Sequence, residues 1–537
     1  MEMIERLAYY GVKAVATLYA RDPASKGGLG LDMSQFGTIL MVWALLQSVV
    51  PVFTGGLSDR YGYKETIFAS TVVKIAGYLV MGFFPTFNGF FAGAVLLATG
   101  TAIFKPGIQG TLVKSTTRQN SSMAWGIFYQ TVNIGGFIGP LVAGKMRKLA
   151  WRNVFFACAG IISCNFLMLL TYREVGKDER LRRARLRKEG KLEQRSLAGE
   201  ALRELGKRHV WVYLLIFSGF WFMFNAIFDV LPAYLEDWVD TRGVVTTLFG
   251  AGGAESALAK FFIVMSKDGK EIQPEGMLNL NAGLIMTTCF LFAALSGRLR
   301  ATSSMVIGTL FAALALVLSG YATVGWLSVF AILVFSVGEM LSSPKFSEFI
   351  GNFAPDDKKA MYLGFSQIPL AVGWTLEGKV GPWLYETFAS KDRFARELLR
   401  DKGLPAERVA KIPNGEAFDH LALLTQESGA LDSSRMALLR DPDGAARALL
   451  ARQGMSAGEL SELKVGGAFR ALAERMDKEH KWQLTRALHR THPRIGMVWY
   501  IMAAVGLVTA LGIYLYGRWI AGLREKAGRR ATEGSPS

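Results

Sequence analysis

A stripe of ionisable and hydroxyl side chains runs along the first apolar segment of the chain. Its members are Glu2, Arg6, Tyr9 and Lys13, flanked by Glu5 and Tyr10. Their spacing of three to four residues places them on one face of a helix. Glu2 and Arg6 are four residues apart and can form an ion pair. Two carboxylates beside one arginine leave one acid incompletely paired, which predicts a site for proton exchange.

The plain alternative for Glu2 and Glu5 is that both lie in water at a helix end. This alternative does not apply to Lys13, which lies deeper in the segment. A buried ammonium is costly in a membrane, so Lys13 indicates a function.

Two further apolar segments carry a charge close to a proline. One contains Lys105-Pro106, and the other contains Gly338-Glu339 followed by Pro344. Interrupted helices at equivalent places in two halves of a chain indicate a transporter's central site. Lys105 and Glu339 have opposite charges, so they can bind opposite ends of a solute. The alternative is a structural ion pair, which is less favoured because a buried pair adds little net stability.

The elements that must position these residues are membrane helices. The chain has 537 residues, 51% of them hydrophobic, and apolar runs of about 20 residues recur along it. We expect an all-α membrane protein with twelve spanning helices in two halves of six. The expected helices are residues 2–20, 34–54, 66–84, 89–113, 123–144, 152–172, 210–235, 281–297, 303–321, 326–350, 361–388 and 495–519.

A polar linker divides this set six plus six. Residues 173–209 hold 13 Lys/Arg against 7 Asp/Glu. Lysine and arginine concentrate in cytoplasmic loops, so the linker is predicted to be cytoplasmic, and the other short basic loops then place both termini on the same side. The expected parts are residues 1–172 as the first bundle, 173–209 as the linker, 210–385 as helices 7 to 11 with an outer loop at 236–280, 386–494 as an extracytoplasmic helical insertion, 495–519 as helix 12 and 520–537 as a cytoplasmic tail.

Residues 386–494 contain 19 Lys/Arg and 16 Asp/Glu among helix-favouring residues. They predict a small helical cap, with a docking surface for an unknown partner as the less favoured alternative. Residues 254–265 of the other outer segment are expected to form an amphipathic stretch.

Composition excludes several classes of protein. The apolar runs argue against a soluble enzyme, and the net charge of +17 is explained by cytoplasmic loops without a nucleic-acid partner. Cys158, Cys164 and Cys289 all lie in apolar runs, so neither a metal site nor a disulfide is expected. No cleavable signal peptide and no cofactor are expected.

The segment after the second helix reads Gly-Gly-Leu-Ser-Asp-Arg-Tyr-Gly-Tyr-Lys over residues 55–64. It resembles the G-x-L-x-D-R-x-G-x-K loop of the major facilitator superfamily. Asp59 and Arg60 then belong to a tight cytoplasmic turn, where Asp59 can accept hydrogen bonds from a helix N-terminus and stabilise one conformation.

Four ordered motifs resemble a narrower family, the proton-dependent oligopeptide transporters (POT). The E-x-x-E-R-F-x-Y-Y-G motif matches residues 2–11 except for Leu7, and G-x-G-x-x-K-P matches residues 100–106 except for Ala102. F-Y-x-x-x-N-x-G is intact at 128–135, and G-E-x-x-x-S-P is intact at 338–344. The motifs span most of the membrane part and neither outer segment.

The resemblance implies a role for each motif residue. Glu2, Glu5 and Arg6 would handle the proton. Tyr9, Tyr10, Lys13, Lys105 and Asn133 would line the substrate pocket, with Lys105 facing a peptide carboxylate. Asn281 and Glu339 would meet the amino end of the substrate.

One position departs from the family pattern. Asn225 replaces a glutamate that follows the Phe220-Trp221 pair in the family, and Asp229 lies one turn further along. Lys13 stands where the family carries arginine. We therefore expect a relocated outer gate in which Lys13 pairs with Asp229; the alternative is that Asp229 faces outer water.

The expected function is proton-driven import of di- and tripeptides by alternating access in the cytoplasmic (inner) membrane, with the lipid bilayer, protons and small peptides as partners. One alternative is the same fold carrying another small anionic or zwitterionic solute. The other is a membrane receptor that binds its ligand without transporting it.

Overall fold

The computed structural model describes residues 1–116, 121–174, 202–353, 365–425, 433–463, 467–476 and 478–533, together with residues 177, 178, 182, 185 and 362. These residues are almost entirely helical, and the only β-structure within them is two isolated bridges, Asp240 with Val324 and Met265 with Ile272. The predicted all-α fold is confirmed.

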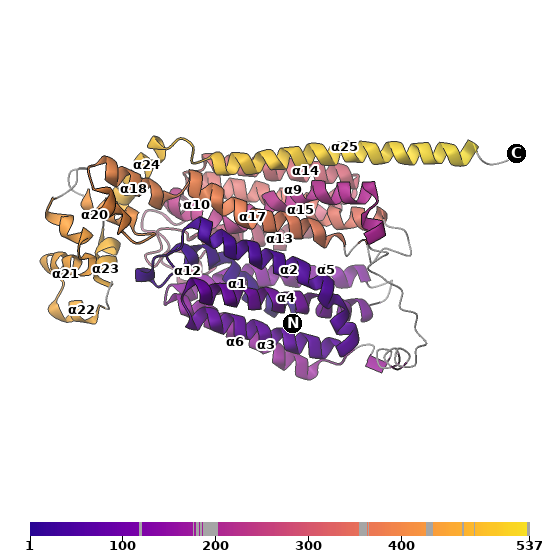
Figure 1. Cartoon of the computed structure of the whole chain (residues 1–537), viewed down its shortest axis with the longest axis horizontal. Helices are drawn as coiled ribbons and strands as arrows, with labels where there is room; N and C mark the ends of the chain where they lie inside the picture. The colour runs from indigo at the N-terminus through magenta and orange to yellow at the C-terminus, as the bar shows by residue number, and fades with distance from the viewer. Residues whose placement is uncertain are drawn as a thin grey trace.

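Six long helices make up the first half of the molecule (Figure 1). They are α1 (Glu2–Arg21), α2 (Met33–Tyr61), α3 (Tyr63–Phe83), α4 (Phe87–Lys114), α5 (Ser121–Arg147) and α6 (Trp151–Thr171). A short 3-10 helix, η1 (Ala24–Lys26), connects α1 to α2. Asp32 fixes the start of α2, because its carboxylate accepts from the Gln35 amide at 2.7 Å while the Gln35 side chain accepts from the Asp32 amide at 3.2 Å.

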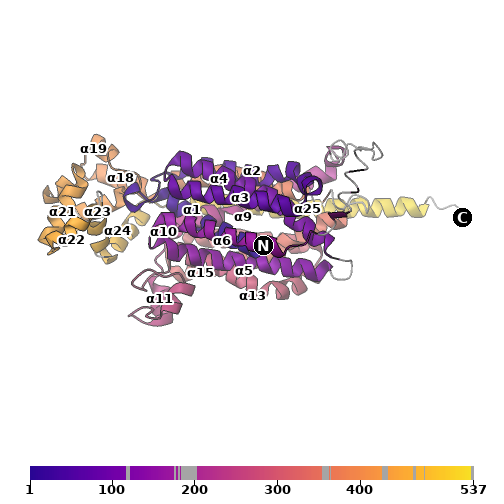
Figure 2. The same cartoon turned by 90° about the horizontal axis from the view of Figure 1, so that it is seen from below.

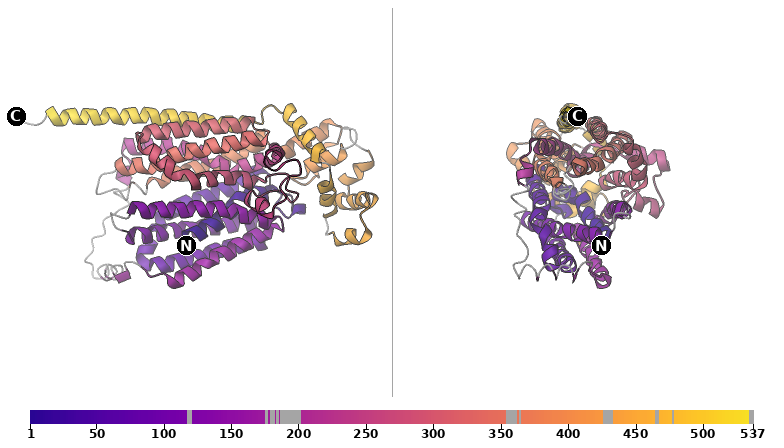
Figure 3. Two further views of the ribbon diagram at one scale, coloured as in Figure 1. Left: turned by 180° about the vertical axis from the view of Figure 1, so that it is seen from behind. Right: turned by 90° about the vertical axis from the view of Figure 1, so that its right-hand side faces the viewer.

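The second half contains the remaining long helices and lies side by side with the first (Figures 1 and 3). Its members are α9 (Arg208–Asp229), α13 (Pro274–Gly297), α14 (Ala301–Tyr321), α15 (Gly325–Phe353), α17 (Gln367–Phe388) and α25 (Met497–Glu533), with the shorter α10 (Leu231–Trp238), α11 (Arg242–Phe249) and α12 (Ala257–Phe262) between α9 and α13.

Several predicted boundaries were wrong. The seventh helix ends at Asp229 and not at residue 235, because Pro232 begins a separate helix, α10. The eighth begins at Pro274, seven residues before the predicted start. The predicted interruptions at Pro106 and Pro344 do not divide α4 or α15, which each continue through the proline.

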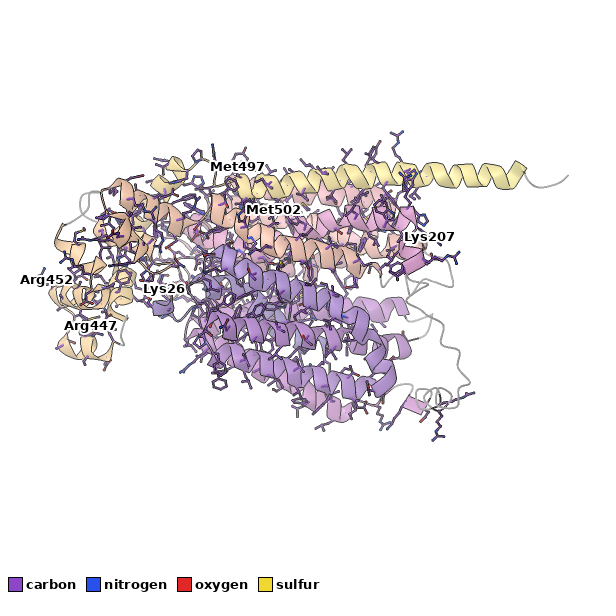
Figure 4. The ribbon with its side chains drawn as sticks, in the orientation of Figure 1. Lys26, Lys207, Arg447, Arg452, Met497 and Met502 are labelled. Carbon is purple, nitrogen blue, oxygen red and sulfur yellow. The ribbon has the colours of Figure 1, made fainter. Side chains whose placement is uncertain are left out.

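The insertion between α17 and α25 is a cluster of short helices at one end of the bundle, which we call the insertion end (Figure 2). Its elements are α18 (Lys391–Asp401), α19 (Ala406–Ala410), α20 (Ala417–Leu424), η3 (Ser433–Leu439), α21 (Pro442–Arg452), α22 (Ala457–Glu462), α23 (Gly467–Arg475) and α24 (Lys478–Thr491). Helix α17 ends at Phe388, which is the end predicted for the eleventh helix. Figure 4 shows Lys26 at the insertion end and Lys207 at the opposite end.

Nine helices within the described residues are long and apolar enough to cross a membrane. They are α2, α3, α4, α6, α9, α13, α14, α15 and α25. The other long helices, α1, α5 and α17, carry more polar residues, and each contributes residues to the cavity between the two halves. The protein is therefore a multi-pass membrane protein, and the predicted total of twelve crossings stays a prediction.

Glycines allow the helices around the interior to approach closely. A Cβ atom added at Gly139 of α5 would lie 2.6 Å from the Leu7 carbonyl oxygen of α1. Across the two halves, a Cβ atom at Gly378 of α17 would lie 2.9 Å from the Met41 nitrogen of α2. Such close approach increases the van der Waals contact between helices, which stabilises their packing in lipid, where the hydrophobic effect does not.

Candidate functional site: a charged cavity between the two halves

A cavity with a volume of about 180 Å³ lies between the two halves. Helices α1, α2, α4 and α5 form one wall, and α9, α13, α15 and α17 form the other. The predicted site residues that line it are Arg6, Tyr9, Tyr10, Lys13, Lys105, Asn133, Asn225, Asn281 and Glu339. One cavity thus collects motif residues that are more than 300 positions apart in the chain.

Charges of opposite sign stand on the two walls. Lys105 projects from α4, and Glu339 projects from α15. Within the described part of the chain, Lys105 has no carboxylate at ion-pair distance, so the structural Lys105–Glu339 pair considered above does not form here. Glu339 instead accepts a hydrogen bond from Asn281 at 3.0 Å, and Asn281 also donates to Ser336 at 3.0 Å. Both charges are therefore available to a solute that enters the cavity.

The Glu2–Glu5–Arg6 cluster differs from the prediction in one respect. Arg6 Nε lies 3.1 Å from Glu2 and 2.6 Å from Glu5. Lys74 of α3, which is fully buried, places its Nζ 3.2 Å from the other Glu5 oxygen. The expectation of two carboxylates beside a single cation was wrong, because Lys74 supplies a second positive charge.

Ion pairs join the halves on the insertion side of the cavity. Lys13 Nζ lies 2.5 Å from Asp229, so the predicted partners are in contact, while the gating role of the pair stays a prediction. Further along, Arg21 lies 2.5 Å from Asp237. Between α5 and α13, Arg147 lies 2.8 Å from Glu275. These pairs hold the two halves together between the cavity and the insertion.

The Asp59–Arg60 segment is helical and not a loop. Helix α2 continues to Tyr61, and the turn consists of Gly62, whose φ of +120° favours glycine. The side chains of Asp59 and Arg60 lie outside the described residues, so the role predicted for Asp59 stays a prediction.

Sequence reasoning missed several polar residues of the interior. Trp43 and Gln47 of α2 line the cavity, where Gln47 accepts from the Tyr9 hydroxyl at 2.9 Å. Asn279 and Trp374 also line it, and the Asn279 amide and the Trp374 indole nitrogen are buried without a hydrogen-bond partner among the described residues. These groups are free to bind a ligand.

A detectable signal existed for Lys74, which is the lone charge in the apolar segment 66–84, and for Glu377, which is one of three charges in segment 361–388, with Lys379 and Glu386. Trp43, Gln47, Asn279 and Trp374 give no such signal, because uncharged polar and aromatic residues are common in membrane helices.

Comparison with known proteins agrees with this architecture. A family model described as "Major Facilitator Superfamily" matches residues 6–376. The chain is 28% identical over 166 residues to "Peptide transporter YePEPT" of Yersinia enterocolitica. The aligned region covers 30% of the chain and 32% of that protein. The first curated relatives thus match over about a third of their own length.

Two further comparisons extend over more of the chain. "Multidrug resistance protein MdtH" of Edwardsiella ictaluri is 23% identical over 65% of the chain and 77% of that protein. The crystal structure of a POT family transporter in complex with 5-aminolevulinic acid superposes with a TM-score of 0.58 at 16% identity, over 72% of the chain and 89% of that structure. The fold expected from the POT resemblance is confirmed. Since the family model covers more than half of its 537 residues, the chain belongs to the major facilitator superfamily, whose members are membrane transporters.

Proposed function

We propose that the protein imports di- or tripeptides together with protons by alternating access. The observation that carries this proposal is the pair of charges, Lys105 and Glu339, on opposite walls of one cavity. A free peptide has a carboxylate at one end and an ammonium at the other, so it can bind both walls at once. Such bridging would draw the halves together around the substrate, which is the coupling that alternating access needs.

In this proposal the insertion end faces outward and both termini are cytoplasmic. The basic residues of the linker and tail support this orientation. A membrane potential that is negative inside then favours proton entry, because moving one charge through 100 mV is worth about 2.3 kcal/mol.

Uptake into proteoliposomes tests the proposal. With an inward proton gradient, the wild type should accumulate radiolabelled dialanine above its external concentration, and a proton ionophore should abolish accumulation. A protein that binds dialanine without accumulating it would be the receptor described above.

Glu5→Gln tests the assignment of the proton pathway. It should abolish accumulation and preserve counterflow exchange, because exchange needs no net proton movement. Glu65→Gln is the matched control, since Glu65 is an exposed carboxylate on α3. Accumulation by Glu5→Gln at the wild-type level would contradict the assignment.

A second candidate function is transport of a smaller zwitterion or an organic anion. The solved POT structure with 5-aminolevulinic acid and the MdtH relative favour it. Competition decides between the two functions: if single amino acids or 5-aminolevulinic acid displace dialanine at equal concentration, the smaller solutes are substrates.

A further inference from the structure

A buried polar cluster lies beside the cavity on its insertion side, where α1, α9 and α17 meet. Asn225 donates from its single amide nitrogen to Asp229 at 2.6 Å and to Glu377 at 2.7 Å. Asp229 is also the partner of Lys13, whose Nζ lies 2.5 Å away. Glu377 is fully buried and Asp229 is 2% exposed. Two carboxyl groups therefore share one amide, and only Asp229 contacts the ammonium.

The charges of this cluster do not balance if both acids are ionised. Helix α17 packs against α2 and α9, and Lys13 reaches Asp229 of the cluster from α1. Asp229 and Lys13 are the charged groups facing Glu377 among the described residues, and the Tyr9 hydroxyl is engaged with Gln47. One ammonium neutralises one carboxylate, and a second buried carboxylate would be left uncompensated. Closely spaced buried acids therefore retain one proton between them.

The geometry indicates which acid holds that proton. Asp229 receives both the ammonium and the amide, which stabilise a carboxylate. Glu377 receives the amide on one oxygen only, and its other oxygen, Oε1, is buried with no hydrogen-bond partner among the described residues. Oε1 occupies space left by Gly381, where an added Cβ atom would lie 2.1 Å from it. A neutral carboxylic acid fits this position better than a carboxylate does.

We propose that Glu377 carries the coupled proton at the insertion end of the cavity. This proposal rests on the proposed function and names the residue that performs one of its steps. With the halves closed at this end, the proton is the O–H of Glu377. After substrate leaves, that O–H bond breaks, the proton passes to water in the cavity, and the carboxylate remains. The uncompensated negative charge then competes with Asp229 for Lys13, which weakens the Lys13–Asp229 pair and favours reopening. A proton from the outer water restores the acid.

This assignment also explains the departure at Asn225. An amide cannot ionise, so residue 225 cannot carry a proton as the glutamate of the resembling family could. Glu377 enters from a different helix and brings a carboxyl group to the same amide nitrogen, 2.7 Å away. In this proposal the acid that carries the proton lies on α17 and not at position 225 of α9.

The first test does not depend on transport. Infrared spectra of the protein in nanodiscs at pH 7 should contain the C=O stretching band of a protonated carboxyl group, and Glu377→Gln should remove it. Glu65→Gln should leave this band unchanged, because Glu65 is exposed on α3 and lies outside the cluster. If the Glu377→Gln difference spectrum contains only carboxylate bands, Glu377 is ionised and the proposal is overturned, whether or not the protein transports peptides.

The second test measures coupling with radiolabelled dialanine in proteoliposomes. Glu377→Gln should reduce proton-driven accumulation at least tenfold and retain counterflow near the wild-type level, which also shows that the variant is folded. Glu386→Gln, a carboxyl group on the same helix that accepts from the Met33 amide at 3.2 Å, is the matched control and should accumulate normally. Accumulation by Glu377→Gln, or loss of both activities in a folded variant, would overturn the proposal. In either case, accumulation by the wild type would leave the proposed function standing.

A rescue experiment tests the relocation itself. The double variant Asn225→Glu/Glu377→Gln returns the acid to α9 and should recover a measurable part of the accumulation lost in Glu377→Gln. No recovery in a double variant that retains counterflow would show that α17, and not the cluster as a whole, must supply the acid, which would contradict the relocation.

Discussion

At the scale of single residues, Lys105 is a charged side chain without an ion-pair partner among the residues that the structure describes. An ammonium inside a membrane protein is normally paired, because an isolated buried charge is expensive. Within the described part of the chain, Lys105 meets no carboxylate, yet it lines a cavity that can hold water or a solute. Its preferred partner is therefore an anionic group that enters from outside.

Lys105→Ala should weaken binding of a peptide with a free carboxylate by about 30-fold or more, because truncating one partner of a hydrogen-bonded charge pair costs at least about 2 kcal/mol. An amidated peptide lacks the carboxylate, so its weak binding should not change with the substitution. Scintillation-proximity or calorimetric titration of both peptides measures this. Equal losses for the two peptides would assign Lys105 to the structure of the cavity and not to recognition.

His420 supplies a residue-scale prediction outside the membrane. Its imidazole is buried in the insertion, stacks on Phe469 with ring centres 4.4 Å apart, and faces Glu416, Asp419 and Arg396. Burial lowers the pKa of His420 to about 4, from an ordinary value of 6.5. The unfolded insertion therefore binds a proton between these values and the folded insertion does not.

Because the unfolded state binds more protons there, stability of the insertion should fall as the pH falls from about 6.5 to about 4, by at most about 3 kcal/mol. Limited proteolysis of the insertion across this range should show increasing cleavage. His420→Phe, which keeps the ring stacking, should flatten the dependence. A His420→Phe profile parallel to that of the wild type would exclude His420 as its origin.

At the scale of elements, α1 and α9 meet through the pair Lys13–Asp229. Thr17 reinforces this contact by donating its hydroxyl to the Asp229 carbonyl at 2.9 Å. The neighbouring Glu377 makes the effects of the two charge reversals unequal. Lys13→Asp would bring three acids together without a cation, whereas Asp229→Lys would place two ammonium groups beside one acid.

We expect both single variants to impair dialanine uptake, with Lys13→Asp impaired more strongly. The double variant Lys13→Asp/Asp229→Lys restores one opposite-charge pair and should recover a measurable part of the uptake. Initial uptake rates at equal protein incorporation measure this. If the loss of uptake in the double variant equals the combined losses of the two single variants, with no recovery, the 2.5 Å contact between Lys13 and Asp229 has no role in the transport cycle.

The sequence identified elements better than their ends. Periodic apolar runs specify where helices lie, because the bilayer requires about 20 apolar residues for each crossing. The end of α9 at Asp229 depends on Pro232, which lies in the first turn of α10. Proline is common at the start of a helix, so the sequence alone did not show whether Pro232 begins a new helix or lies within a longer one.

Among the site residues, the positions within the four motifs could be predicted from the sequence. Lys74 and Glu377 could not be assigned to the clusters that they join, since their partners come from helices distant in the sequence.

At the scale of the whole molecule, the insertion bridges the two halves. It follows α17 of the second half, yet its helix α23 contacts η1 of the first half, and Figure 4 shows Lys26 of η1 next to the insertion. Lys26 lies 3.3 Å from Asp419, and Ser25 donates a hydrogen bond to Glu416. Burial opposes ionisation of Asp419, but Lys26 and Lys481 outweigh it and hold the pKa of that carboxyl below its ordinary value. The contact is therefore an ionised, partly buried pair at neutral pH.

If transport alternates access, the insertion end must open, and the insertion must separate from η1 in every cycle. Bridging Ser25→Cys and Glu416→Cys with a short, reducible bifunctional thiol reagent, in a background without Cys164 and Cys289, should therefore stop dialanine uptake, and reduction should restore it. Arg396→Cys with Asn414→Cys is the matched control, because both residues belong to the insertion and their side chains lie 3.4 Å apart. Bridging this control pair should leave uptake unchanged, since it joins nothing that must separate. Full uptake with Ser25 and Glu416 bridged would mean that the insertion moves with the first half, and that the opening occurs between the insertion and α17.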